Sequence, residues 1–190
     1  MRDAGVGRVL LASLHQGIAD TLPTRLGFYE SWLHAEGLRD GTIGLAPLYA
    51  VLSFLRQEGD GVYARITTSA GEYAAEWTVQ SMGALERSFI KAAPDWLRPR
   101  LVLQLCGRLV RASYRNGRLA FRLRSGTATL DLRSSVFCDV RDPVNHPLCG
   151  FYTAAFARLL SLFNVPATIV VDSCRAAGGK GCTMTVETRQ

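Results

Sequence analysis

At residues 116–132, NGRLAFRLRSGTATLDL, the sequence changes from a helical to a strand pattern. This stretch opens on Asn-Gly, a strong turn signal, and then alternates apolar and basic residues over 118–124. Ser-Gly follows as a second turn signal, and residues 128–132 alternate again. Strict alternation is typical of strands with one buried face. The stretch therefore predicts two short antiparallel strands of a β-meander.

Apolar residues recur with a helical period through most of the sequence before this stretch. The predicted helices cover residues 6–18, 21–38, 46–57, 62–82 and 94–114. The window 62–82 is the least regular, because its Thr-Thr-Ser run also suits a strand or loop, and a helix is favoured there. The N-terminal half is therefore expected to be helical.

After the meander, the apolar residues follow a helical period in one segment and a strand period in two others. The predicted elements are an apolar-rich helix over 149–163 and two strands over 167–174 and 182–187, joined by a glycine-rich turn. We therefore predict an α+β fold, in which helices pack on one face of an antiparallel sheet. Residues 1–115 would form the helical half and residues 116–190 the meander, helix and hairpin, together making one compact domain over 1–190.

Composition and charge narrow the function classes. The protein has 190 residues, 48% of them apolar and 20% charged, which excludes a disordered, collagen-like or coiled-coil protein. Its 22 Lys+Arg exceed its 16 Asp+Glu, yet Lys91 and Lys180 are the only lysines and the arginines are dispersed. Without a basic tail we expect no nucleic-acid partner. No signal peptide or membrane span is recognisable, so a cytoplasmic protein is expected.

Three of the five cysteines lie in the last 42 residues of the sequence. An antiparallel hairpin would place Cys174 and Cys182 side by side, and Cys149 begins the helix before that hairpin. Three thiolates with one carboxylate or imidazole would make a closed tetrahedral zinc site. Asp172 and His146 are the candidates for the fourth ligand.

The cysteine spacing leaves two other interpretations open. The three residues could be small buried hydrophobes beside the hairpin, or Cys174 and Cys182 could form a redox pair. The remaining cysteines, Cys106 and Cys138, are expected to be buried core residues.

Residues 137–186 resemble the 4-vinyl-reductase domain family. The resemblance rests on HPLC at 146–149, the aromatic-rich helix that follows, and C-R-A-x-G-x-x-x-C at 174–182. That family includes a bacteriochlorophyll 4-vinyl reductase, whose branch is the most similar, and phenol-sensing input domains of some bacterial transcription activators. The resemblance implies a fold shared with the Bet3-type subunits of a vesicle-tethering complex, usually dimeric, with a buried pocket for an apolar ligand.

The resemblance also implies a zinc site. Cys149, Cys174 and Cys182 match the three cysteines that bind zinc in the sensor branch, together with an acidic residue. Asp172 is the nearest acid, but Val171 stands at the family's position. A one-residue shift turns a strand side chain to the opposite face, so the fourth ligand departs from the family pattern.

An aromatic-rich apolar face could line a pocket rather than an ordinary core. The candidate ligand-binding residues are Phe151, Tyr152, Phe156 and Arg158 on the C-terminal helix, with Tyr73 and Trp77 from the helical half. The apolar members would surround a flat ligand, and the arginine would pair with a ligand carboxylate.

Three functions follow from these observations. The first is a binding module for a hydrophobic, aromatic or tetrapyrrole-like molecule, acting as carrier, accessory factor or sensor, and expected to be a homodimer. The second is a reductase of the 4-vinyl group of a bacteriochlorophyll precursor, and the third is a structural dimer subunit. The binding module is favoured over an enzyme, because the sequence offers no P-loop, no nucleophile elbow and no site for a hydride donor.

Overall fold

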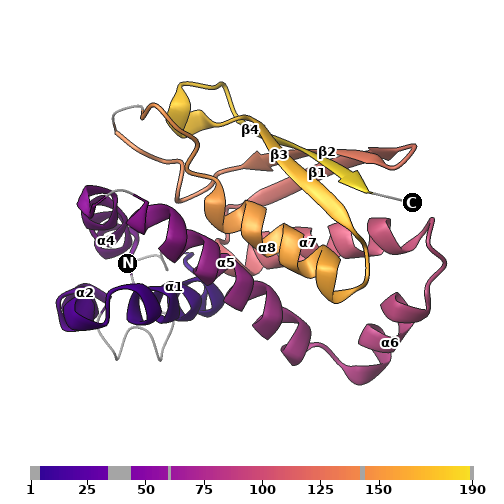
Figure 1. The fold of residues 1–190 in the computed structure, drawn as a ribbon, viewed down its shortest axis with the longest axis horizontal. Coiled ribbons are helices and arrows are strands. Elements are labelled where there is room, and N and C mark those ends of the chain that lie inside the picture. The colour runs from indigo at the N-terminus through magenta and orange to yellow at the C-terminus, as the bar shows by residue number, and fades with distance from the viewer. Residues whose placement is uncertain (1–4, 34–43, 60, 142–143, 189–190) are drawn as a thin grey trace.

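A layer of helices packs against a four-stranded antiparallel sheet in the computed structural model, which describes residues 5–33, 44–59, 61–141 and 144–188 (Figure 1). The helices are α1 (Arg8–Thr21), α2 (Leu26–Leu33), α4 (Leu45–Gln57), α5 (Val62–Ser81), α6 (Ala84–Ala92), α7 (Arg98–Ser113) and α8 (Gly150–Leu162), with short 3-10 turns η1 (Pro23–Arg25) and η2 (Arg175–Ala177). The predicted α+β class is confirmed.

The strands are β1 (Arg118–Arg124), β2 (Thr127–Arg133), β3 (Ala167–Ser173) and β4 (Cys182–Thr188). Their order in the sheet is β1-β2-β4-β3, and every neighbouring pair is antiparallel. The meander prediction is confirmed, with Arg124 opposite Thr127 across the turn. Ser125 and Gly126 have φ of 46° and 81°, the left-handed pair that a two-residue hairpin turn requires.

One face of the sheet is buried and the other faces solvent. Leu130 of β2 and Met184 of β4 are paired in register and completely buried. Beneath them lie α7, packed on β1, and α8, packed on β3 (Figure 1). The period-2 pattern thus buries one side of each strand, as the sequence indicated.

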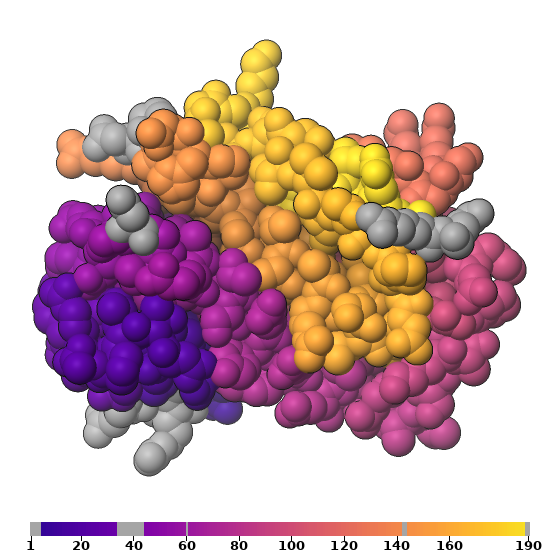
Figure 2. Space-filling model, viewed as in Figure 1, coloured from indigo at the N-terminus to yellow at the C-terminus, as the bar shows by residue number. Residues whose placement is uncertain are grey.

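The helices α5 and α8 pack closely at the centre of the molecule. A Cβ added to Gly71 of α5 would lie 2.2 Å from the carbonyl oxygen of Phe151, so only glycine permits this approach. Figure 2 shows α1 and α2 at one end of the molecule and α6 with the start of α7 at the other, with the α8 segment between them. The position of α8 makes it the link between helices and sheet.

Helix boundaries differ from the prediction in three places. The segment 62–82 is helical, as favoured, but α6 had no counterpart in the prediction. The predicted helix 21–38 is a 3-10 turn followed by α2, and its end lies outside the described residues. The predicted start of α7 near Pro94 is replaced by a turn, in which the N–H groups of Leu97 and Arg98 donate to the Pro94 carbonyl.

None of the helices in the described ranges combines the length and the apolar character that a membrane crossing requires.

Candidate functional site

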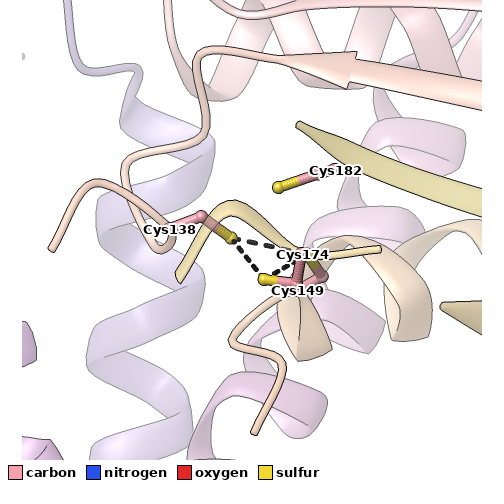
Figure 3. A group of neighbouring side chains, drawn as sticks. All are labelled: Cys138, Cys149, Cys174 and Cys182. Atoms are coloured by element: carbon pink, nitrogen blue, oxygen red, sulfur yellow. Dashed lines mark hydrogen bonds between the residues drawn. The ribbon is translucent and has the colours of Figure 1, made fainter. Parts of the chain in front are cut away.

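Four cysteine side chains meet in the interior of the protein, where the sheet, the long loop after β2 and the start of α8 come together. They are Cys138, Cys149, Cys174 and Cys182, and Figure 3 shows their sulfur atoms pointing toward a common centre. All four sulfurs lie within 4.8 Å of one another. Each residue is 3% exposed or less. We refer to these four residues as the cysteine cluster.

Each member of the cluster comes from a different segment. Cys138 lies in the loop after β2, Cys149 directly precedes α8, Cys174 follows β3, and Cys182 begins β4. The glycine-rich turn holds the last two together: Gly179 donates its N–H to the Cys174 carbonyl at 2.9 Å. The cluster therefore joins the sheet, the loop and α8 at one point.

The sulfur atoms contact one another directly. Cys138 Sγ lies 3.4 Å from Cys149 Sγ and 3.6 Å from Cys174 Sγ, and the Cys149 thiol donates to Cys174 Sγ at 3.3 Å (Figure 3). Two backbone groups also point at sulfur: the N–H of Leu148 donates to Cys174 Sγ at 3.4 Å, and that of Arg175 to Cys182 Sγ at 3.5 Å. Such donors stabilise negative charge on sulfur.

Cys182 is the member of the cluster whose thiol pKa is lowered. The facing thiols of Cys138 and Cys149 lower the pKa of the Cys182 thiol, and the Arg175 N–H adds to this effect. The same interactions raise the pKa of Cys149, through its contacts with Cys138 and Cys182 and through burial. These interactions therefore favour the ionised form of Cys182 over that of Cys149.

Four converging thiols could hold a metal ion. Thiolate–metal bonds of about 2.3 Å in a tetrahedron place the sulfurs about 3.8 Å apart. The three separations among Cys138, Cys149 and Cys174 are 3.3, 3.4 and 3.6 Å, and no two of the four sulfurs are more than 4.8 Å apart. Soft sulfur ligands select thiophilic transition metals. Closure on all four sides suits a structural ion rather than one that reacts with substrate.

The structure assembles three of the four predicted metal ligands. Cys149, Cys174 and Cys182 come together, but Asp172 does not join them: it is exposed and accepts a hydrogen bond from Thr185 Oγ1 at 2.8 Å. His146 is also exposed, with its ring nitrogen 2.9 Å from the Asn145 side-chain oxygen. Neither candidate for the fourth ligand lies beside the three sulfurs in this structure.

Cys138 is buried, as predicted, but its sulfur also lies beside those of the other three cysteines, which was not predicted. Its loop has no helical or strand period, so the pattern gave no reason to fold it back toward the hairpin. The available signal was its place in the same C-terminal part of the sequence as the other three. Cys106 is a buried core residue on α7, as predicted.

The predicted ligand-binding residues lie in three different environments. Phe151, Tyr152 and Phe156 are completely buried and pack on one another beside Phe137. Tyr73 stacks on Trp77 at 5.6 Å between ring centroids, and its hydroxyl donates to Asp20. Arg158 donates to Glu76 through Nε and Nη2, at 2.9 and 2.6 Å, and borders a surface groove of about 630 Å³. A pocket shared by all six stays a prediction.

Comparison with known proteins gives similarity to solved structures only; no family model and no curated protein matches. An H-NOX protein from K. algicida, in an Fe(II) unliganded state, superposes with a TM-score of 0.63, 13% identity and coverage of 97% of both proteins. The fold is H-NOX-like. An Fe(II) H-NOX protein from S. oneidensis gives 0.59, 11% identity and 97% of both proteins.

A second kind of protein also shares this H-NOX-like fold in part. The phenol-responsive sensory domain of the transcription activator PoxR, solved with phenol, gives a TM-score of 0.52 at 12% identity, over 76% of this sequence and 74% of that one.

These findings correct the predicted family. The assignment to 4-vinyl-reductase domains with a Bet3-type fold is wrong, because no family model matches and the structural similarity over the full length is to H-NOX proteins. The reductase alternative loses its support with it. The assignment rested on short cysteine and aromatic motifs of one hairpin and one helix, which constrain the rest of the fold little.

The predicted zinc cofactor is also wrong, because the H-NOX structures were solved in Fe(II) states. Iron anchored by a single axial side chain takes His, Cys, Met or Tyr. Of the histidines in the described residues, His15 is 2.8 Å from Glu30 and His146 is exposed. Neither histidine lies with the cysteine cluster, whose sulfurs could hold a single ion.

Proposed function

We propose that this protein is a small-molecule sensor domain whose C-terminal hairpin is fastened to the helical layer by a metal ion in the cysteine cluster. The observation that carries the proposal is the H-NOX-like fold over the full length. Among the solved structures that share it are complexes with CO, NO and phenol. Two kinds of protein with this fold thus hold a small molecule.

The cysteine cluster supports the second half of the proposal. Its four sulfurs come from four segments that include both strands of the hairpin and the start of α8. An ion held by all four would supply a positive centre that keeps the thiols ionised and the segments together. The protein's own contribution is to bury the sulfurs and to aim the N–H groups of Leu148 and Arg175 at them.

The position of α8 would allow ligand binding to change the arrangement of the helices and the sheet. α8 packs on α5 on one side and on β3 on the other, and Cys149 directly precedes its first turn. Gly71 holds α5 in close contact with α8 at Phe151. A ligand that shifts α8 would therefore move the helical layer relative to the sheet, with the cluster as the fixed point.

We also propose that the protein binds its ligand without catalysing a reaction. It would act as a homodimer in the cytoplasm. Phe137 packs against Tyr152 of α8, and these rings suit an apolar ligand in a minor, opened conformation.

The test measures metal and ligand separately. Protein purified without oxygen is analysed for first-row transition metals and then exposed singly to NO, CO and phenol, with the melting temperature and hydrogen exchange of α8 as readouts. We expect one metal ion per protein molecule and at least one ligand that raises the melting temperature and slows exchange in α8. Cys106→Ser is the matched control, because Cys106 is buried but outside the cluster. A metal-free protein that no ligand affects would contradict the proposal.

A further inference from the structure

A surface cavity of about 890 Å³ lies at the opposite end of the sheet from the cysteine cluster. It forms where the α6–α7 connection, the β1–β2 turn and the α8–β3 connection meet. Thr188, which borders the cavity, and Cys182 stand at the two ends of the 7-residue strand β4, about 20 Å apart at the usual rise per residue. The cavity is therefore separate from the cluster.

An indole ring offers a stacking surface in this cavity. Trp96 lies in the turn before α7 and is 75% exposed, which is unusual for so large an apolar side chain. Pro99, Leu123, Val165 and Pro166 add an apolar lining. A planar aromatic ring can stack on indole in an offset arrangement.

Arg98, two residues after Trp96, places a guanidinium at the same cavity. The Arg98 side chain is only 19% exposed, and its Nη2 donates to the Ala93 carbonyl at 2.9 Å. Its Nη1 pairs with Asp95 Oδ1 at 3.0 Å, but the Asp95 side chain is 93% exposed, so this pair is weak and replaceable. Its Nε is buried without a hydrogen-bond partner among the described residues. The Arg98 guanidinium is thus held in place, and not all of its N–H groups are used in hydrogen bonds within the described residues.

We propose that this cavity binds a small aromatic carboxylate. The ring would stack on Trp96, and the carboxylate would accept hydrogen bonds from the Arg98 guanidinium in place of Asp95. Ser125, Asn164 and Thr188 border the same cavity and supply polar groups around the ligand. This inference rests on the proposed function in one respect: the carboxylate bound here would be the molecule that the domain senses.

A single arginine with a competing aspartate argues for one carboxylate rather than a more highly charged ligand. Asp95 and Arg98 are the two charged residues that border the cavity within the described ranges, and they carry opposite signs. A phosphate group commonly meets several cationic or backbone donors. A monoanion with an aromatic body matches this balance better than a dianion.

The first experiment compares three probes by calorimetry or NMR titration: benzoate, its neutral isostere benzamide, and the saturated analogue cyclohexanecarboxylate. We expect saturable binding of benzoate, with affinity for the other two lower by about tenfold or more, since each lacks either the charge or the ring. Equal binding of benzoate and benzamide, or no saturation with benzoate, overturns the proposal.

The second experiment uses variants. Arg98→Gln should weaken benzoate binding by about tenfold or more, whereas Arg100→Gln, exposed on the same helix and outside the cavity lining, should leave it unchanged. Asp95→Asn should strengthen binding by removing the competing carboxylate, and it tests the site even if Arg98→Gln fails to fold. Wild-type affinity in both Arg98→Gln and Asp95→Asn contradicts the assignment. A response to NO, CO or phenol without benzoate binding would remove this site and leave the sensor proposal standing.

Discussion

Cys138 Sγ lies 3.4 Å from Cys149 Sγ and so ties the loop after β2 to the start of α8. This contact brings a residue from the meander side of the fold to the helix that packs against α5. It also completes the cysteine cluster, whose other two members stand at the facing ends of β3 and β4. Removing one sulfur therefore affects the sheet and the helical layer together.

Cys138→Ser should abolish metal binding and lower the free energy of unfolding by about 3 kcal/mol, within the range for loss of a metal ligand or a buried network. The measurements are metal content and urea unfolding. Cys106→Ser, buried on α7 and outside the cluster, should keep the wild-type metal content. Equal metal content in the two variants would remove Cys138 from the ligand set.

Asp172→Asn should leave metal content and melting temperature unchanged. The carboxylate is exposed and accepts a hydrogen bond from Thr185 rather than facing the sulfurs. An amide oxygen can accept the same bond. Loss of metal in this variant, measured by elemental analysis, would instead place Asp172 among the ligands, as the sequence had suggested.

Gly71→Ala should destabilise the fold by about 2 kcal/mol or more, as overpacking of a tight contact does. The added Cβ would lie 2.2 Å from the Phe151 carbonyl oxygen, so α5 and α8 must separate. The control is Gly107→Ala on α7, whose Cβ would meet nothing within 4 Å and which should stabilise the protein by about 0.5–1 kcal/mol. Chemical unfolding of both variants distinguishes close packing from a general intolerance of substitution.

Alkaline pH should destabilise the metal-free protein. Burial raises the pKa of the Cys106 thiol above the 9.0 of an unfolded polypeptide, and burial likewise raises the pKa of the Tyr152 hydroxyl above 10.0. A group whose folded pKa is raised contributes stability that is present below the unfolded pKa and lost as pH rises above it. The loss is at most about 1.4 kcal/mol per pH unit for each group.

The check is a pH series of urea unfolding from 7 to 11 on chelator-treated protein. Cys106→Val removes one titrating thiol while keeping a small apolar side chain, so its stability should fall less steeply above pH 9. Parallel slopes for the two proteins would show that Cys106 ionises alike in the folded and unfolded states.

The elements with a clear period were predictable from sequence, and the contacts between distant segments were not. The alternation at 118–132 predicted β1 and β2, and the glycine-rich turn predicted the hairpin of β3 and β4. α6, a nine-residue helix, was missed although Leu85 and Phe89 recur at a helical spacing.

For the cysteine cluster as well, local pairing was predictable from sequence and contacts between distant segments were not. The hairpin brought Cys174 and Cys182 together by local pairing, and Cys149 followed from the helix start. Cys138 reaches the cluster through an irregular loop, whose path depends on tertiary packing rather than on any period. Asp172 was chosen because it is near in sequence, but strand alternation turns its side chain to solvent.

We propose that a metal-bearing cysteine cluster organises a small-molecule sensor domain. Native mass spectrometry of the oxygen-free wild-type protein, recorded with and without NO, CO, phenol or benzoate, tests both parts in one measurement. We expect a mass equal to the polypeptide plus one metal ion minus the displaced thiol protons, and a further shift by one ligand. A spectrum that shows only the metal-free, ligand-free polypeptide under every condition would contradict it.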